Sequence, residues 1–297
     1  NAAVNVDFTL KTTALRLNTD DSFIKFPEIQ YISKLSDFEY DMQDRILRMQ
    51  EKRKAEKELV TPDRLLRTDL KNPEKPNFFA TSTIRDTISF NAQKASYNLD
   101  GEYIEAENIN YIRIADALIQ PEKGRIKIGR RAMIDPLQNA VVAINNRHLL
   151  HSAGINIESA RKYSGRGIYD YTDDSGEVRN ISFSEVTVDT MATSARGFIT
   201  SGENFMLSPA FTFTGDVNLY SGQEFLLFTG AAGIVNTCPS VKSAPVQFKS
   251  FIDPRNVMIP ASDKPRDING NPVMTGSLLN IDAMTIYPAF LSEQRSW

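Results

Sequence analysis

The residues of this chain that could perform chemistry are few and scattered. Its two histidines, His148 and His151, stand three positions apart in "NNRHLLHSAG". The flanking residues have the pattern of a strand, in which positions three apart point to opposite sides. A zinc site would also need further ligands, and the sequence has no HExxH motif and no cysteine pair. We interpret both as ordinary turn or rim histidines and predict no metal site.

Carboxylate pairs could serve glycoside hydrolysis, in which two acids flank the scissile bond. The candidate pairs are Asp170 with Asp173 or Asp174, and Asp189 with Glu185. The segment "DDSG" has the composition of a β turn, so we interpret its acids as local hydrogen-bond acceptors. Phosphate-binding loops and the GxSxG nucleophile elbow are absent from the sequence. We therefore predict no catalytic residue and no cofactor.

The segment "SARKYSGRGIYDYTDDSGEVRNISFSEVTVD" could form a binding surface instead. Its tyrosines have large aromatic faces and polar tips, which suit stacking on sugars, although they could equally pack against a neighbouring coil. Gly165 and Gly167 predict a bend between strands. The candidate residues for binding a glycan or a partner are Tyr163, Arg166, Tyr169 and Tyr171.

Composition sets further limits. The chain has 297 residues, 41% hydrophobic and 24% charged, which is typical of a folded protein with a sizeable core. A net charge of -3 gives no basic excess for nucleic acid, and no apolar run is long enough for a transmembrane helix. A single cysteine, Cys238, excludes an internal disulfide, and we interpret it as a small buried apolar residue.

The N-terminal part divides into three segments. Residues 1–35 alternate apolar with polar side chains and are predicted to be β. Residues 36–60 are predicted to form a charged amphipathic helix, because Phe38, Met42, Ile46 and Met49 have the spacing of one helix face. Ser36 with Glu39 matches a capping box. The proline-bearing residues 61–77 are predicted to be a linker, with a domain boundary near Asn77.

Short β units follow over residues 78–237, and turn signals at Gly101 and Gly176 predict hairpins. A small residue followed by branched apolar residues recurs in "AENINYI", "ADALI", "NAVVAI" and "SAGINI". This phrase favours a mainly β solenoid, either a right-handed β-helix or a stacked β-jellyroll; a sandwich or barrel is the alternative. Residues 238–297 are predicted to be a less regular β and loop tail that continues into a longer chain.

The run "FNAQKASYNLDGEYIEAENINYIRIADALIQPEKGRIKIGRRAMIDPLQNAVVAI" resembles the repeats of stacked β-jellyroll proteins of the lipopolysaccharide-transport type. The longer pattern, from about Phe79 to Thr237, is similar to that of very large uncharacterised envelope proteins of Gram-negative bacteria. The resemblance implies an extracytoplasmic location, in the periplasm or at the outer-membrane surface. It also implies other envelope proteins, a glycan or a lipid as partners.

Three functions follow as hypotheses. The first is a non-enzymatic structural or binding scaffold of the bacterial cell envelope, part of a larger protein or complex. The second is a β-helical carbohydrate-active enzyme, a polysaccharide lyase or hydrolase. Such lyases generally place acids and a basic residue along one outer face; the candidates are Asp116, Lys127 and Arg130, or alternatively Arg161, Lys162 and Arg166. The third is lipid or lipopolysaccharide conveyance, which requires an apolar groove.

Overall fold

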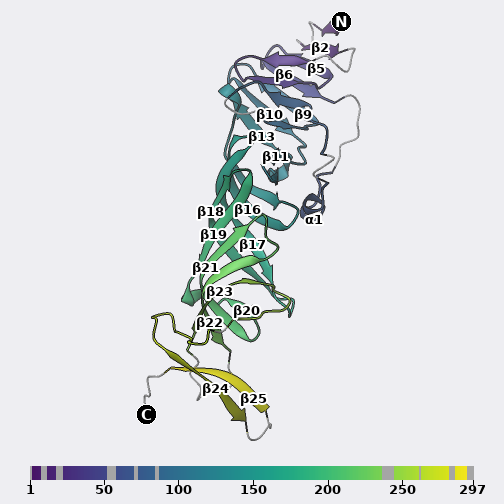
Figure 1. Cartoon of the computed structure of the whole chain (residues 1–297). Coiled ribbons are helices and arrows are strands. Elements are labelled where there is room, and N and C mark those ends of the chain that lie inside the picture. The colour runs from purple at the N-terminus through teal and green to yellow at the C-terminus, as the bar shows by residue number, and fades with distance from the viewer. Residues whose placement is uncertain are drawn as a thin grey trace. The chain divides into compact units, whose positions relative to one another are not determined.

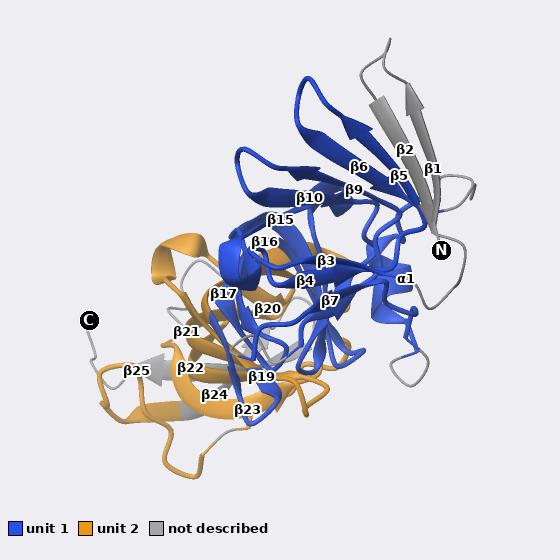
Figure 2. Ribbon diagram, turned by 90° about the horizontal axis from the view of Figure 1, so that it is seen from above, with its two compact units in different colours: residues 1–167, 186–193 blue, residues 168–185, 194–297 orange. Residues whose placement is uncertain are grey.

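The computed structural model describes residues 2–7, 12–17, 23–51, 58–69, 73–83, 87–235, 244–260, 262–280 and 285–292. The chain is mainly β, as the sequence predicts, and its sheets are large and antiparallel. It divides into two compact units, coloured separately in Figure 2: unit 1 is residues 1–167 and 186–193, and unit 2 is residues 168–185 and 194–297. Cys238, which was predicted to be buried, lies outside the described residues.

Unit 1 contains two sheets between which the chain alternates (Figure 1). The strand order of the first sheet is β1-β2-β5-β6-β9-β10-β13-β14, with the bounds β1 Ala2–Asp7, β2 Thr12–Leu17, β5 Asp37–Asp41, β6 Ile46–Gln50, β9 Lys94–Asn98, β10 Tyr103–Glu107, β13 Ile126–Gly129 and β14 Met133–Ile134. The order in the second sheet is β16-β15-β12-β11-β8-β7-β4-β3, with the bounds β3 Ile24–Phe26, β4 Tyr31–Ser33, β7 Phe78–Ala80, β8 Ser89–Phe90, β11 Ile112–Ile114, β12 Ala117–Gln120, β15 Leu137–Ile144 and β16 His148–Ser159. Two consecutive strands enter one sheet and the next two enter the other.

The interior of unit 1 is filled by every second side chain of these strands. Ile104 and Ile128 are opposite each other in the first sheet, and both are fully buried. Ile112 and Ile119 form the equivalent buried pair in the second sheet. The sheets contact each other, because the ring of Phe26 on β3 lies edge-on to that of Tyr97 on β9, with centroids 5.1 Å apart. Alternating burial therefore explains the recurring branched apolar phrases of the sequence.

Residues 36–60 do not form the predicted helix, and that prediction is wrong over Asp37–Gln50. This segment is the hairpin β5–β6, in which Phe38 is directly opposite Met49 and both are buried. The carboxylate of Asp41 accepts hydrogen bonds from the backbone N–H groups of Gln43 and Asp44 at 3.0 and 3.1 Å, which closes the turn. The apolar residues have helical spacing only because a four-residue turn separates those of β5 from those of β6.

The predicted linker at residues 61–77 contains the helix α1, Pro62–Leu66, whose Leu65 is fully buried against Leu118 and Ala143. Asn77 is not at a unit boundary. Its side chain is buried, donates to the carbonyl of Ala92 at 2.7 Å and accepts from the N–H of the same residue at 2.9 Å. Pro62 occupies the start of α1, where its missing N–H is not needed, and segment 61–77 belongs to unit 1.

Unit 2 is also built from antiparallel strands. The strands β17 Lys162–Thr172, β18 Val178–Asp189 and β19 Ala192–Ile199 have residues in both units. The order within unit 2 is β23-β22-β21-β19-β18-β17, β20 pairs with β21, and β24 pairs with β25. The remaining bounds are β20 Met206–Ser208, β21 Phe211–Tyr220, β22 Leu226–Ile234, β23 Val246–Ile252, β24 Val273–Asn280 and β25 Thr285–Ser292. The predicted tail thus contributes strand β23 and a terminal hairpin.

An aromatic cluster fills the interior of unit 2. The ring of Phe213 lies perpendicular to that of Phe228, with centroids 5.0 Å apart, and Phe248 approaches Phe213 at 5.7 Å. Tyr171 contacts both Phe228 and Phe205, at 5.8 and 5.5 Å. Such edge-on pairs add to the stabilisation gained by burying large apolar surfaces.

Helices are short in the described part of the chain. Besides α1, they are the 3-10 turns η1 Glu122–Gly124, η2 Arg130–Ala132 and η3 Ser201–Glu203. Among the helices of these residues, none has the length and apolar character needed to span a membrane.

The strand pairing decides between the two predicted solenoid types. A right-handed β-helix stacks its strands in parallel, whereas every strand pair described within the two units is antiparallel. The right-handed β-helix is therefore wrong. The hairpins predicted at Gly101 and Gly176 are confirmed: Gly101 lies between β9 and β10, and Gly176, with a φ of +85°, lies between β17 and β18.

Gly165 lies inside strand β17 and does not form the predicted bend. A Cβ at this position would collide with the carbonyl oxygen of Gly154 on β16 and would lie 2.9 Å from Ile155. We expect Gly165→Ala to lower the free energy of unfolding by about 1–3 kcal/mol, because the strands must separate to admit the methyl group.

The matched control is Gly202→Ala, because a Cβ at Gly202 meets nothing within 4 Å. Chemical denaturation of the two variants and the parent chain measures the difference. Equal midpoints for Gly165→Ala and the parent would show that this close strand contact is absent.

Candidate functional site

Tyr163 and Tyr171 do not form the predicted outward platform, because both are buried. In unit 1 the hydroxyl of Tyr163 shares a hydrogen bond with Thr193 Oγ1 at 2.8 Å, and burial raises its pKa well above the ordinary value. In unit 2 the hydroxyl of Tyr171 donates to the carbonyl of Leu207 at 2.9 Å, and burial likewise raises its pKa. Each ring packs in a core and each hydroxyl is used internally.

Tyr169 and Arg166 are more accessible. The ring of Tyr169 is half-buried and lies edge-on to Phe183, with centroids 6.3 Å apart; burial, and then the charge of Asp170, raise its pKa. Arg166, in unit 1, is exposed. Of the four predicted binding residues, only Arg166 therefore presents an exposed side chain.

The residues proposed for a lyase site serve different structural purposes in unit 1. Asp116, in the turn between β11 and β12, accepts hydrogen bonds from the backbone N–H of Thr193 at 3.0 Å and from its hydroxyl. Lys127 is on β13 of the other sheet and lies over the ring of Tyr103 at 4.0 Å, whereas Arg130 is in the 3-10 turn η2 that follows β13 and pairs with Glu102. The acid and the two cations do not share one face.

The acidic turn "DDSG" has the structural role that its composition suggests. The Asp173 carboxylate is buried and accepts hydrogen bonds from Ser175 Oγ at 2.5 Å and from the Arg179 guanidinium at 2.6 Å. Backbone N–H groups of Ser175 and Glu177 add two more. Burial raises the pKa of Asp173, but these hydrogen bonds outweigh it and the net pKa is lowered.

His148 is fully buried at the start of strand β16, so the prediction of a turn or rim histidine is wrong for it, and His151 is half-buried three positions later. Their different environments agree with the expectation that they point to opposite sides of a strand.

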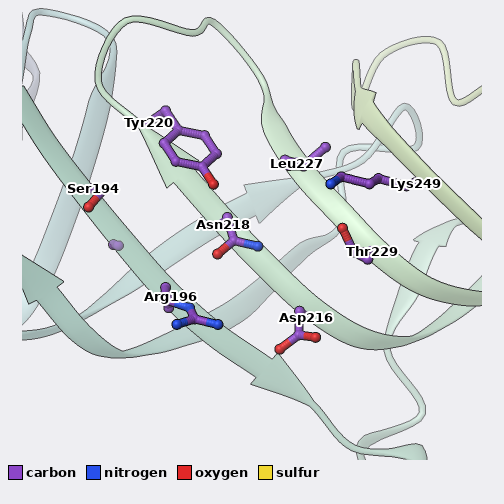
Figure 3. A pocket seen from close by; sticks show the side chains of 9 residues that line it. Ser194, Arg196, Asp216, Asn218, Tyr220, Leu227, Thr229 and Lys249 are labelled. Carbon is purple, nitrogen blue, oxygen red and sulfur yellow. The ribbon is translucent and has the colours of Figure 1, made fainter.

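Polar side chains gather on the outward face of four neighbouring strands in unit 2, around a shallow depression of about 420 Å³ (Figure 3). We call this surface the polar face. It belongs to β19, β21, β22 and β23, and its members are Ser194, Arg196, Asp216, Asn218, Tyr220, Leu227, Thr229 and Lys249.

Strand alternation produces this face. On β21, Asp216, Asn218 and Tyr220 point outward, while the intervening Val217 and Leu219 are fully buried. The same alternation buries inward-facing side chains on β19 and β23 and leaves the outward ones in solvent. The core of unit 2 thus fixes which side chains reach the polar face.

Strand register sets the neighbours across the polar face. Arg196 is opposite Asn218, and Ser194 is opposite Tyr220. Asp216 is opposite Thr229, which in turn is opposite Lys249. Figure 3 shows Asn218 between Arg196 on one side and Lys249 on the other.

Aromatic side chains border this polar centre. Tyr220 is 42% exposed, Phe198 on β19 is 59% exposed, and Phe251 on β23 is 43% exposed. Phe198 is opposite Asp216, and Phe251 is opposite Leu227.

The residues of the polar face were not among those predicted from the sequence. Its members are spread over residues 194–249 and share no motif, because each strand contributes only alternate positions. The available signal was the alternation in "FTFTGDVNLY", whose even positions are polar or aromatic. That pattern shows which side of β21 is outward, but the neighbours across strands depend on register.

The buried Asp173 carboxylate makes stability depend on acid. Its native pKa is lowered, so its stabilising effect is complete above the unfolded value of about 4 and is lost as pH falls through the native pKa. We expect Asp173→Asn to lower the free energy of unfolding at pH 7 by about 2 kcal/mol and to reduce its dependence on pH between about 5 and 2.

Asp174→Asn is the control, because that neighbouring carboxyl is exposed and accepts no hydrogen bond in the described part of the chain. Urea denaturation across this pH range measures both effects. Identical pH profiles for Asp173→Asn and the parent would contradict the role assigned to the carboxylate.

Comparisons of the chain with protein-family models, with curated proteins and with solved structures find no match. The candidate site of this chain is therefore defined by its geometry, and the polar face of unit 2 combines a depression, two cations and exposed aromatic rings.

Proposed function

We propose that this chain is a non-enzymatic structural and binding scaffold of the bacterial cell envelope and part of a larger protein or complex. The supporting observation is the alternation of hairpins between the two antiparallel sheets of unit 1. Such a plan can be lengthened by further hairpins without a new core, which suits a spacer or docking element. The proposed location is extracytoplasmic, in the periplasm or at the outer-membrane surface.

A stacked β-jellyroll is the architecture that we propose for unit 1. Antiparallel pairing and repeated passage between two sheets agree with it. The resemblance to lipopolysaccharide-transport-type repeats gives the same architecture and motivates the envelope location. Other envelope proteins are the proposed partners.

The enzyme alternative has less support. Hydrolysis of a glycoside generally uses two carboxylates across the bond, and the polar face contributes one, Asp216. Of the lyase candidates, Asp116 lies in the turn between β11 and β12 of one sheet, whereas Lys127 and Arg130 lie on β13 of the other sheet and in the turn η2 that follows it. We therefore propose binding without turnover.

Lipid conveyance also has less support. An acyl chain needs an apolar groove, whereas side chains already fill the space between the sheets of unit 1 at Ile104, Ile112 and Ile128, each with no exposed surface. A scaffold needs only this packed interior, and its contacts can be made by outward residues.

Subcellular fractionation tests the scaffold proposal. In the bacterium that encodes the chain, an antibody against it should detect the native protein in the periplasmic or outer-membrane fraction. Markers for cytoplasm, inner membrane, periplasm and outer membrane provide the controls. Detection in the cytoplasm alone would refute the envelope location.

Two further measurements separate the alternatives. Native mass spectrometry of the protein purified from envelopes should show the mass of the polypeptide without bound lipid. Incubation with acidic polysaccharides, with and without calcium, should release no unsaturated product. A lipid adduct would favour conveyance instead, and product release would favour a lyase.

A further inference from the structure

We propose that the polar face of unit 2 binds an acidic oligosaccharide, one that carries uronate or sulfate groups. This inference rests on the proposed binding function and specifies its ligand and its residues. It replaces the tyrosine platform predicted from Tyr163 and Tyr171, whose rings are buried.

The first argument is charge. Arg196 and Lys249 supply two cations to the polar face, and Asp216 supplies one carboxylate. The protein as a whole has a net charge of -3, so this local excess is opposite in sign to the overall charge. Within the described residues, neither cationic side chain has a hydrogen bond or an ion pair, so both can take up an anionic group from solution.

The second argument is spacing. Arg196 is on β19 and Lys249 is on β23, and β21 and β22 lie between them. Neighbouring strands are separated by about 4.8 Å, so the backbones of β19 and β23 are about 14 Å apart. An extended ligand that carries more than one anionic group, as an acidic oligosaccharide does, matches cations placed on strands this far apart.

The third argument is the combination of aromatic and neutral polar groups. A sugar ring has an apolar face that stacks on an aromatic ring and hydroxyl groups at its edge that form hydrogen bonds. Tyr220 supplies an exposed ring, Asn218 supplies an amide two positions away on the same strand, and Thr229 supplies a hydroxyl on the neighbouring strand opposite Asp216. The depression is partly open to solvent, which lets a chain of sugars lie across the strands.

The distribution of these groups disfavours a protein partner. Protein interfaces generally have an apolar centre with few charges and a polar rim. Here the order is reversed: Asp216 and Asn218 occupy the centre, while the exposed rings of Phe198 and Phe251 lie at the border. A central carboxylate also opposes a nucleic-acid backbone.

Isothermal titration calorimetry of the purified chain tests the proposal. The probes are an oligogalacturonate, a sulfated oligosaccharide and a neutral maltooligosaccharide of equal length, with a polyglutamate peptide and anionic lipid vesicles as the competing classes. We expect binding of at least one acidic oligosaccharide, weakening as salt is raised, and no binding of the neutral sugar, the peptide or the vesicles.

Variants locate the site. Arg196→Gln and Lys249→Gln should each weaken binding about tenfold, through the loss of a charge-assisted hydrogen bond. Tyr220→Ala should weaken it by a similar factor, whereas Tyr220→Phe keeps the ring and should bind as the parent does. Arg255→Gln is the matched control, because Arg255 is an exposed arginine of unit 2 outside the polar face. Unchanged thermal midpoints would show that the variants fold.

The outcomes are distinct. Failure of both acidic oligosaccharides to bind, preference for the peptide or the vesicles, or binding that these variants leave unchanged would each overturn the inference. If the protein fractionates with the envelope but binds no acidic sugar, the scaffold proposal stands and this inference fails. If it binds through the polar face but resides in the cytoplasm, the proposed location fails and this site stands.

Discussion

The packing of alternate side chains into buried interiors is the constraint on which the rest of this structure depends. A strand can bury one side only if its register places every second residue inward, and a slip of one position would expose the entire apolar set. In unit 1, Ile104 and Ile128 in one sheet and Ile112 and Ile119 in the other satisfy this requirement at full burial. In unit 2, the aromatic cluster around Phe213 and Phe228 does the same.

The backbone conformation of the turns is imposed by that strand register. Arg45, Glu102, Asn146 and Met191 all have positive φ at hairpin turns, a region that L-residues other than glycine enter at some cost. The cost is tolerated because the paired strands on either side fix where the chain must reverse. Polar acceptors follow the same logic: Asp173 is buried, Asp116 is partly buried, and each accepts hydrogen bonds that hold a particular turn, so both are poor candidates for catalysis.

Function is left to the outward positions. Because the interiors are filled, contacts with a ligand or partner must come from side chains that the strands direct into solvent. The polar face of unit 2 is such a surface, and its composition is independent of the packing beneath it, since outward residues can change without disturbing the core. This separation explains how a chain without a catalytic motif can still present a chemically specific surface.

The sequence by itself determined the β character of the chain, the hairpins at Gly101 and Gly176, and the structural role of the "DDSG" turn, because period-two alternation and turn chemistry act over a few residues. The prediction of a helix over Asp37–Gln50 was wrong, because apolar residues on both sides of a turn happened to have helical spacing. The prediction that Tyr163 and Tyr171 are exposed was wrong, because period-two alternation separates the two faces of a strand without showing which face is buried. Only the tertiary structure decided the allocation of hairpins to two sheets and the meeting of Arg196, Asn218 and Lys249 on one face. Those residues come from different strands, and their proximity depends on the register between strands that are far apart in the sequence. A local sequence pattern contains no information about that register.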